Sequence, residues 1–345
     1  MNTALDRTLQ SPVLVTGAGG FIGGRLAERL ATQGLRVRGL VRQTEQAPAL
    51  AERGIEPVFG DLTRPQDLGP AVSGCAVVFH CAGWMGEPPS WEAASAVNRE
   101  GTRHLLEACL AAGVGRFIHV STISVYGPTP AMTIDEQTSL WPLGYYRESK
   151  IAAEREVEAA SRRGLETVVV RPGQVFGPGD RRLAGMVLRW LSRGLPVLVD
   201  GGWGFCHPLY VDNLVDALLA AAGAEDAVGQ VFNLADCDMH WRQFLGHFAR
   251  MTGRPLRSVP SWVVRVIARG TEGVAAITRR PAWLPSDEVA YFLRTSRYSR
   301  ARAQEVLQWA PRVPMREAME ATEAWLRRAG LLSVSFPTTE VVARV

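Results

Sequence analysis

Hydrophobic and polar positions divide most of the chain into short apolar runs separated by longer stretches with helical spacing. The apolar runs are almost continuous and rich in β-branched residues, which is typical of parallel strands buried on both faces. The longer stretches repeat their apolar positions every three or four residues, as amphipathic helices do. This pattern predicts strands at residues 12–16, 35–41, 55–59, 76–81, 116–121, 167–170 and 230–234, and helices at residues 21–33, 91–112 and 145–163.

Strands that alternate with helices predict an α/β fold, here a doubly wound parallel sheet of Rossmann type. The pattern changes after Arg171, where residues 172–180 hold three glycines and two prolines, and from Asp236 the chain is helical, rich in tryptophan and without regular strands. We therefore expect a Rossmann domain of residues 1–172 and 207–235, a smaller, mainly helical substrate lobe of residues 173–206 and 236–330, and a flexible tail of residues 331–345.

Composition narrows the class of protein. The chain has 345 residues, 47% hydrophobic and 21% charged, with a formal net charge of +4. Its arginines are not grouped with aromatic residues, so we expect no nucleic-acid partner. The five cysteines form no CxxC pair, and Asp212 with Asp216 lacks a third ligand, so we expect no metal. No apolar run could span a bilayer and the first ten residues lack a signal-peptide core, so a cytoplasmic protein is expected.

A glycine-rich turn lies between the first predicted strand and the first predicted helix. Gly17 permits the tight turn, Gly20 lets backbone N–H groups approach a pyrophosphate, and Gly23 lets the helix pack closely on the strand. Phe21 and Ile22 begin the helix, whose N-terminus presents unpaired donors and the positive end of a dipole. The turn predicts a dinucleotide site, with a purely structural turn as the alternative.

The end of the second strand bears on which dinucleotide is bound. NAD sites commonly place a carboxylate there for the ribose 2′-hydroxyl, and this chain has none. Arg42 follows the strand instead and suits a 2′-phosphate, because its guanidinium binds phosphate bidentately. The sequence therefore favours NADP(H) over NAD(H), unless Arg42 is only a solvated surface cation.

Tyr146 and Lys150 form the clearest catalytic pair. Their i, i+4 spacing places them on the same face of the predicted helix, and Lys150 is the only lysine in the chain. Hydride transfer to a carbonyl leaves an oxygen that needs a proton, and a phenol can donate it if a neighbouring ammonium lowers the pKa of the phenol. A third group should orient the substrate oxygen, and the strand at residues 116–121 leads to three candidates for it, Ser121, Thr122 and Ser124.

Together these motifs resemble the extended short-chain dehydrogenases/reductases, the NAD-dependent epimerase/dehydratase superfamily. The resemblance runs in order from about residue 11 to residue 330. It rests on the glycine turn, on Tyr146 with Lys150, and on the segments Gly60-Asp61-Leu62, His80-Cys81-Ala82-Gly83, Val120 to Gly127, Arg171-Pro172-Gly173 and Gly177-Pro178-Gly179.

The resemblance implies roles for particular positions. Tyr146 would be the proton donor or acceptor, Lys150 its partner and a ribose ligand, and Thr122 the hydroxyl that binds the substrate oxygen. Ser124 would line the pocket, together with Trp84 and Phe205. The remaining cofactor contacts would come from Asp61 and Leu62 at the adenine, from Ala82 and Gly83 along the cofactor, and from Pro172, Gly173 and Val175 at the nicotinamide. Asp61 has an alternative role as a helix cap.

Within the family the chain looks most similar to the 3β-hydroxysteroid dehydrogenase and dihydroflavonol reductase branch. Nucleotide-sugar enzymes usually carry an arginine shortly before the position of Tyr210, and this chain has Cys206 there. Tryptophans and aliphatic residues of the smaller lobe favour a lipophilic substrate, with ordinary core packing as the alternative. We therefore expect an NAD(P)-dependent oxidoreductase that interconverts a hydrophobic ketone and a secondary alcohol.

Other functions and partners remain open from the sequence. A nucleotide-sugar epimerase or dehydratase would use the same catalytic residues, whereas a catalytically silent NAD(P)-sensing regulator would not need them. The family expectation is a homodimer. Arg265 and Arg269, with Val266 and Ile267 between them, could form a peripheral membrane contact.

Overall fold

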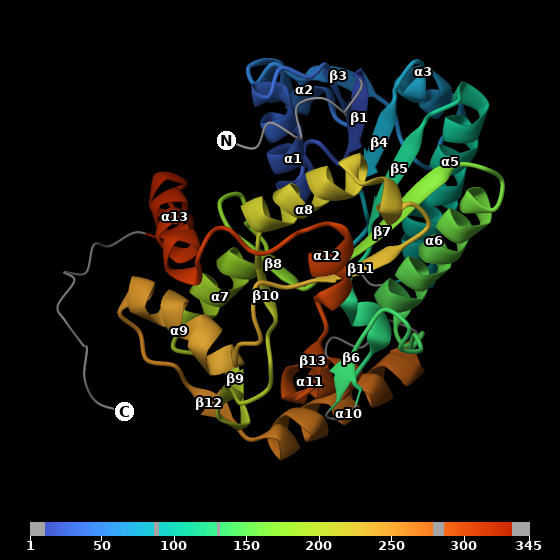
Figure 1. Ribbon diagram of the computed structural model, residues 1–345. Coiled ribbons are helices and arrows are strands. Elements are labelled where there is room, and N and C mark those ends of the chain that lie inside the picture. Colours follow the sequence, from blue (N-terminus) through green and yellow to red (C-terminus); the bar gives the residue numbers. More distant parts are fainter. Residues whose placement is uncertain (1–10, 86–89, 130–131, 279–285, 333–345) are drawn as a thin grey trace.

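The computed structural model contains a seven-stranded parallel sheet with helices on both faces (Figure 1). It describes residues 11–85, 90–129, 132–278 and 286–332, without the side chains at 276, 277, 287 and 288. The strand order is β11 (Val231–Leu234), β7 (Glu166–Pro172), β5 (Arg116–Val120), β4 (Val77–His80), β1 (Val13–Thr16), β2 (Val37–Val41) and β3 (Glu56–Phe59). The predicted strands and the Rossmann-type fold are confirmed.

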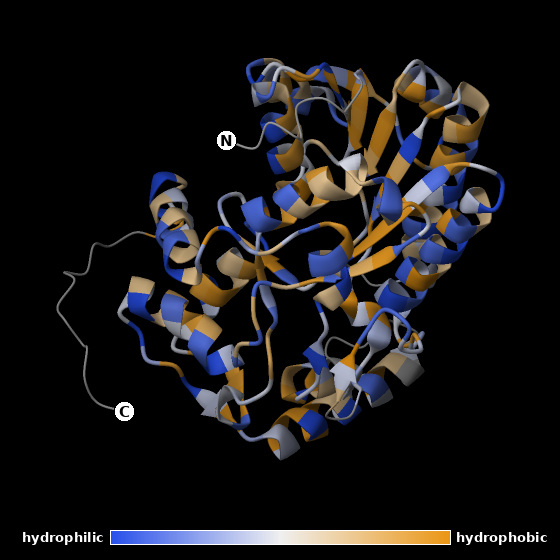
Figure 2. Ribbon diagram, viewed as in Figure 1, coloured by the Kyte–Doolittle hydropathy of each residue, from blue (hydrophilic) through white to orange (hydrophobic). Residues whose placement is uncertain are grey.

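The sheet is buried on both faces, which explains its nearly continuous apolar strands. Val15, Phe79 and Ile118 point into one core, whereas Leu14 and Val78 point into the other. Figure 2 shows the strands as the most hydrophobic part of the fold. The first core is closed by α1 (Phe21–Thr32), α2 (Ala47–Ala51), α8 (Val211–Gly223) and α12 (Ala301–Val306), and the second by α3 (Leu68–Val72), α5 (Gly101–Ala112) and α6 (Tyr145–Ser161).

The helix predicted at residues 91–112 is not uniform. It begins as α4 (Trp91–Ala94), where the Ser90 hydroxyl accepts a hydrogen bond from the Ala93 N–H at 3.1 Å. It widens into a π-helical turn over Ser95–Glu100 and continues as α5. Periodicity alone could not predict this turn, because one wider turn barely alters the apolar spacing.

The smaller lobe has its own apolar core. Phe176, Phe244 and Leu326 lie in it, contributed by segments far apart in the sequence. Two-residue strands follow Asp236, where the sequence predicted no regular strands, because short backbone pairings leave no periodic signal. The remaining elements are α7 (Leu183–Ser192), α9 (Trp241–Thr252), α10 (Ser261–Thr278), α11 (Ser286–Leu293), α13 (Met315–Arg328), and the strand pairs β8 (Gln174–Phe176) with β10 (Pro208–Tyr210), β9 (Leu198–Val199) with β12 (Ser258–Val259), and β6 (Thr133–Ile134) with β13 (Arg297–Tyr298).

The chain returns to the Rossmann core after the smaller lobe. Ala303, Leu307 and Trp309 are buried in the first core of the sheet, although they fall in the range expected for the substrate lobe. Leu331 and Leu332, which begin the expected tail, pack against the core of the smaller lobe. Residues 333–345 lie outside the described part of the chain.

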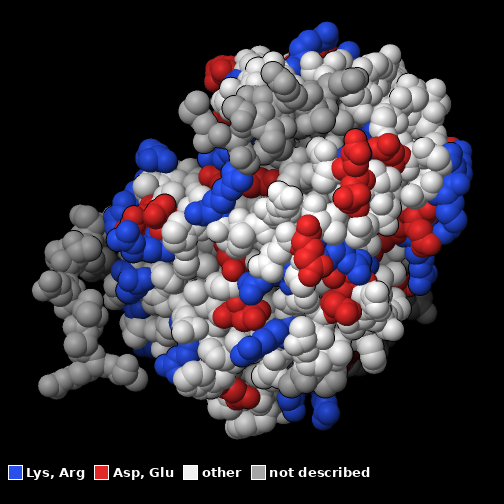
Figure 3. Space-filling view, viewed as in Figure 1, with Lys and Arg blue, Asp and Glu red and all other residues white. Residues whose placement is uncertain are grey.

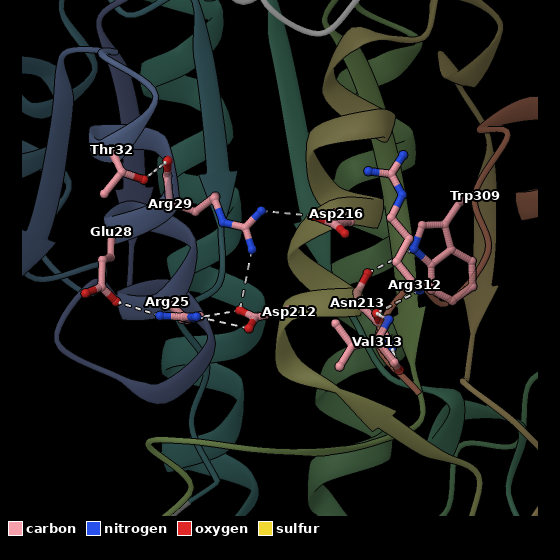
Figure 4. A network of polar contacts seen from close by, with 10 residues as sticks. All are labelled: Arg25, Glu28, Arg29, Thr32, Asp212, Asn213, Asp216, Trp309, Arg312 and Val313. Atoms are coloured by element: carbon pink, nitrogen blue, oxygen red, sulfur yellow. Dashed lines mark hydrogen bonds and ion pairs between the residues drawn. The ribbon is translucent and has the colours of Figure 1, made fainter. Parts of the chain in front are cut away.

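Polar contacts tie α8 to α1 on one side and to the returning chain on the other (Figure 4). The Arg25 guanidinium binds the Asp212 carboxylate at 2.6 and 3.0 Å, and Arg29 lies 3.3 Å from Asp216. Asn213 is fully buried and bonds the chain at residues 312–313. Asp212 and Asp216 are therefore ion-pair partners of α1.

Figure 3 shows acidic and basic side chains interspersed over the face in view. Within the described ranges, no helix combines the length and the apolar character needed to cross a membrane. In the same residues, no cluster of three His, Cys, Asp or Glu side chains is arranged to hold a metal ion.

Candidate active site

The glycine turn forms a close cradle at the carboxyl end of β1. Gly17 has φ +69°, which favours glycine, and a Cβ at this position would lie 3.0 Å from the Ala82 backbone. A Cβ at Gly23 would lie only 2.5 Å from the Gly17 carbonyl oxygen. Gly20 precedes α1 and offers no side-chain cap, so the first N–H groups of α1 have no side-chain partner from the cap residue. This arrangement fits a dinucleotide pyrophosphate.

The predicted adenosine residues follow β2 and β3 at the same edge. Arg42 is exposed directly after β2. Burial raises the pKa of Asp61, but hydrogen bonds from Thr63 and the charges of Arg42 and Arg64 bring it below its ordinary value, which places Arg42 near this carboxylate. Leu62 packs its side chain into the second core, so only its backbone is available for a cofactor.

The segment after β4 is held by a buried asparagine that the sequence analysis did not single out. Ala82 donates its N–H to the Thr16 hydroxyl at 3.1 Å, and Gly83 is exposed beside it. The Trp84 N–H donates to Asn98 Oδ1 at 2.6 Å, and Asn98 Nδ2 donates to the Trp84 carbonyl at 3.1 Å. Asn98 lies in the π-helical turn. This turn therefore holds in place the segment after β4, along which the cofactor is predicted to bind.

The predicted catalytic residues meet where β5 ends and α6 begins. Thr122 follows β5, and its hydroxyl lies 3.1 Å from the Ser124 hydroxyl and within hydrogen-bonding reach of the Tyr146 phenol. Tyr146 is the second residue of α6 and half-buried. Lys150 is buried one turn later, and its Nζ donates to the Val120 carbonyl at 2.7 Å. The structure thus brings together the hydroxyls and the ammonium that the sequence had grouped.

The pKa values of the pair differ from the sequence expectation in one respect. Burial raises the pKa of Tyr146 to about 12, partly opposed by the positive charge of Arg182 and by hydrogen bonding to Thr122. Burial lowers the pKa of Lys150 to about 8, and the negative charge of Glu154 opposes this shift. The positive charge of Arg182, at the start of α7, is thus a contribution to the phenol pKa that the sequence did not predict.

A buried charged network supports Lys150 from the next turn of α6. Arg171 donates to both carboxylate oxygens of Glu154, at 3.0 and 2.5 Å, and the Ser121 hydroxyl donates to the same carboxylate. Arg171 also donates to the Tyr126 hydroxyl at 2.6 Å. Ser121, one of the three candidate hydroxyls, is therefore committed to Glu154 and is not free for a substrate.

The remaining predicted residues lie on the side of the smaller lobe. Pro172 ends β7, and Gly173 is crowded, since a Cβ there would lie 2.3 Å from the His207 carbonyl oxygen. Val175 lies in β8 between two apolar cores. Phe205 stacks its ring on His240 with a centroid distance of 4.6 Å, so its observed ring contacts belong to the lobe.

The roles of three residues at the site were not predicted from the sequence, for different reasons. Arg171 is a charged residue within an apolar strand, and this pattern indicates a buried acidic partner. Glu154 follows Lys150 by four residues, as Lys150 follows Tyr146, so all three share one face of α6. This spacing indicates Glu154 as the acidic partner of Arg171. Asn98 left no signal, since an asparagine in a helical pattern is usually solvated.

Comparison with known proteins places the chain among its relatives. Residues 13–235 match the model of the NAD dependent epimerase/dehydratase family. A 4-hydroxy-2-methyl-3-oxo-4-farnesyl-3,4-dihydroquinoline-1-oxide ketoreductase of Stigmatella aurantiaca is 29% identical, over 92% of this chain and 96% of its own. The decarboxylating sterol-4-alpha-carboxylate 3-dehydrogenase of Homo sapiens is 29% identical, over 89% of this chain and 86% of its own.

A solved structure extends the comparison to three dimensions. MoeE5, solved in complex with UDP-glucose and NAD, is 28% identical and superposes with a TM-score of 0.74, covering 92% of this chain and 99% of its own. These relatives confirm the prediction of an NAD(P)-dependent oxidoreductase similar to the 3β-hydroxysteroid dehydrogenase branch. The chain belongs to the NAD dependent epimerase/dehydratase family, as the extended short-chain motifs indicated.

Proposed function

We propose that the protein interconverts a ketone and a secondary alcohol on a hydrophobic substrate. The observation that carries the proposal is the meeting of Thr122, Tyr146 and Lys150 at the edge of the sheet that also holds the glycine turn. Ligands bind at this edge in doubly wound folds. The names of the ketoreductase and the sterol dehydrogenase, which refer to a farnesyl-bearing quinoline and a sterol, support a lipophilic substrate.

In the proposed mechanism the side chains of the protein hold and protonate the substrate oxygen. The carbonyl oxygen accepts hydrogen bonds from the Thr122 hydroxyl and the Tyr146 phenol. The nicotinamide, when bound, supplies the hydride that the carbonyl carbon accepts. Tyr146 gives its proton to the oxygen, which becomes the alcohol, and the Lys150 ammonium stabilises the phenolate that remains. Alcohol oxidation uses the same groups in reverse.

The phenol is suited to donate a proton because its pKa of about 12 keeps it protonated throughout the neutral range. The substrate would also contact Ser124, with Trp84 and Phe205 as further lining residues. The residues proposed to hold the cofactor are Gly17, Gly20, Phe21, Ile22 and Gly23 at the pyrophosphate, Arg42, Asp61 and Leu62 at the adenosine, Ala82, Gly83 and Lys150 along its length, and Pro172, Gly173 and Val175 at the nicotinamide.

NADP(H) is the proposed cofactor because Arg42 is an exposed guanidinium at the end of β2. Replacing Arg42→Ala should raise the KM for NADPH by about tenfold or more, since a charge-assisted contact to the 2′-phosphate is lost. The KM for NADH should stay within about twofold, because NADH has no such phosphate. Arg36→Ala, at another exposed arginine, is the matched control. Equal changes for both cofactors would refute this role of Arg42.

The proposed reaction is tested by offering NADPH and, separately, NADH with a panel of 3-ketosteroids, 2-alkyl-3-oxoalkanoates and prenylated aromatic ketones, alongside UDP-glucose and UDP-galactose. Stoichiometric cofactor consumption with an apolar ketone supports the proposal. Interconversion of the sugar nucleotides without net consumption would replace it with an epimerase.

The epimerase is the second candidate because MoeE5 was solved with UDP-glucose and NAD. Its usual arginine before the position of Tyr210 is absent here, and Cys206 is fully buried. Burial raises the pKa of this thiol well above its ordinary value, so the position carries no charge for a diphosphate. Arg294 lies nearby, but its guanidinium contacts the Phe205 carbonyl and the Tyr298 hydroxyl, so it is used within the lobe.

A further inference from the structure

The outward face of α10 is apolar, although such a face normally packs inward. Trp262, Val266 and Val274 are 68%, 63% and 59% exposed. Neighbouring residues of this set are four or eight positions apart, so the three share one side of the helix. Ala268, on the opposite side, is fully buried. The helix therefore buries Ala268 and leaves several of its large apolar side chains in the solvent.

Two arginines follow the edge of this face. Arg265 and Arg269 are exposed and lie four residues apart, beside Trp262 and Val266. The charges of Arg265 and Arg269 act on the carboxylates of Asp200 and Glu272, which accept bonds from the backbone N–H groups that begin α10 and α11, at 2.7 and 2.8 Å. Both guanidinium groups stay exposed, so an external anion can reach them.

A second exposed indole lies near the start of α10. Trp203 is 58% exposed and follows the turn at Asp200, which is bonded to the first residue of α10. The Arg242 guanidinium lies 4.3 Å above the Trp203 ring. Indoles flanked by arginines are typical of the boundary between lipid headgroups and acyl chains.

The position of α10 connects this face with the active site. Figure 1 shows α10 along the lower rim of the molecule, away from β2 and β3. It packs against α11, whose Tyr291 lies close enough to the Tyr146 phenol to influence it electrostatically. The apolar face therefore belongs to the helix pair that borders the candidate catalytic phenol.

We propose that this face docks on an anionic lipid bilayer, with its apolar side chains in the headgroup boundary and its arginines on lipid phosphates. It consists of Trp203, Trp262, Arg265, Val266, Ile267, Arg269 and Val274. A second copy of the chain fits less well, because a twofold contact through α10 would bring the same arginines together. A bilayer supplies both the apolar phase and the negative charge, and it holds the lipophilic molecules that the proposed reaction uses.

Flotation of the full chain with vesicles tests the proposal independently of turnover. The vesicles contain phosphatidylcholine alone, or phosphatidylcholine and phosphatidylglycerol in equal amounts. The protein should float with the anionic vesicles, and about 0.5 M salt should weaken this binding, because screening shortens electrostatic attraction to a few ångströms. Tyr146→Phe should float like the unmodified chain, so a failure of the proposed chemistry leaves this result unaffected.

Variants assign the binding to the face. Trp262→Ser with Val266→Ser, and separately Arg265→Glu with Arg269→Glu, should each lower the partition coefficient at least about tenfold. The matched controls are Phe59→Ser for the apolar pair and Arg162→Glu with Arg316→Glu for the charged pair, all exposed on other elements. Absence of flotation by the unmodified chain, or flotation that the α10 variants leave unchanged, would overturn the proposal. The proposal would also be overturned if the apolar variant converted a dimer to a monomer and the unmodified chain bound no vesicles.

Discussion

At the scale of single residues, Lys150 has closely constrained surroundings. It is the only lysine among 38 basic residues, and it is buried. Its ammonium is held by the Val120 carbonyl and by the negative charge of Glu154. Burial brings its pKa to about 8, so the ammonium is present below that pH and is lost as the pH rises through it. An arginine at this position would keep its positive charge. Its planar guanidinium, however, is not the compact, rotatable donor that this space holds.

Glu154 should control the pH at which Lys150 loses its proton. In the reductive direction, kcat/KM should fall as the pH rises through about 8, because deprotonated Lys150 no longer stabilises the phenolate. Glu154→Gln removes the charge that raises the pKa of Lys150, so this decline should begin at a lower pH. The measurement is the pH profile of kcat/KM for both proteins.

A control on the same helix separates this effect from a general loss of charge. Glu158→Gln changes an exposed carboxylate paired with Arg162, and its profile should match that of the unmodified chain. Glu154→Gln should also lower the free energy of unfolding by about 3 kcal/mol, because Arg171 loses its buried partner. An unshifted profile in folded Glu154→Gln would show that the carboxylate is structural only.

At the scale of elements, the turn between β1 and α1 sets where the cofactor can bind. Gly17 adopts a left-handed backbone conformation, and Gly23 sits against the carbonyl oxygen of Gly17. Both features keep the start of α1 close to the end of β1, so the donors of α1 point to the edge of the sheet. The catalytic residues reach the same edge from β5 and α6.

Gly23→Ala should therefore impair cofactor binding. The added Cβ would lie 2.5 Å from the Gly17 carbonyl oxygen, so the turn must shift. We expect the Kd for NADPH to rise at least about tenfold, which corresponds to about 1.4 kcal/mol. Gly69→Ala, at an exposed helical glycine with nothing within 4 Å of an added Cβ, should leave the Kd unchanged. Titration of NADPH fluorescence measures both values, and an unaltered Kd in Gly23→Ala would contradict this account of the turn.

Some features of these elements could be predicted from the sequence and others could not. Strands such as β1 and β5 were predictable because burial on both faces demands continuous apolar runs. The positions of Tyr146 and Lys150 were predictable because helical spacing is regular. The π-helical turn around Asn98 was not, since it depends on hydrogen bonds to a distant loop. The partnership of Glu154 with Arg171 joins a helix to a strand, and only the fold brings the two together.

At the scale of the whole molecule, α8 connects the cofactor-binding helix to the chain that returns from the smaller lobe. Figure 4 shows the ion pairs to α1 on one side of α8 and Asn213 on the other. Asn213 Oδ1 accepts from the Arg312 and Val313 N–H groups at 3.1 and 2.9 Å, and its Nδ2 donates to Asp236 at 3.0 Å. A single buried amide thereby joins three segments.

Asn213→Ala should lower the free energy of unfolding by about 2 to 3 kcal/mol, because several buried polar groups lose their partner. Arg29→Ala removes a partly exposed ion pair to Asp216 and should cost about 1 kcal/mol or less. Urea denaturation of both variants gives the comparison. Equal losses would mean that the buried amide contributes no more than a surface pair.

The assignment of Tyr146 as the proton donor is tested by single-turnover reduction by Tyr146→Phe with an active ketone and NADPH. The variant lacks only the phenolic hydroxyl, so NADPH should bind with nearly unchanged Kd. The rate of NADPH oxidation should fall by at least about a hundredfold, which is the contribution typical of a general acid. Oxidation of NADPH at a rate close to that of the unmodified chain would contradict the assignment of Tyr146 as the proton donor.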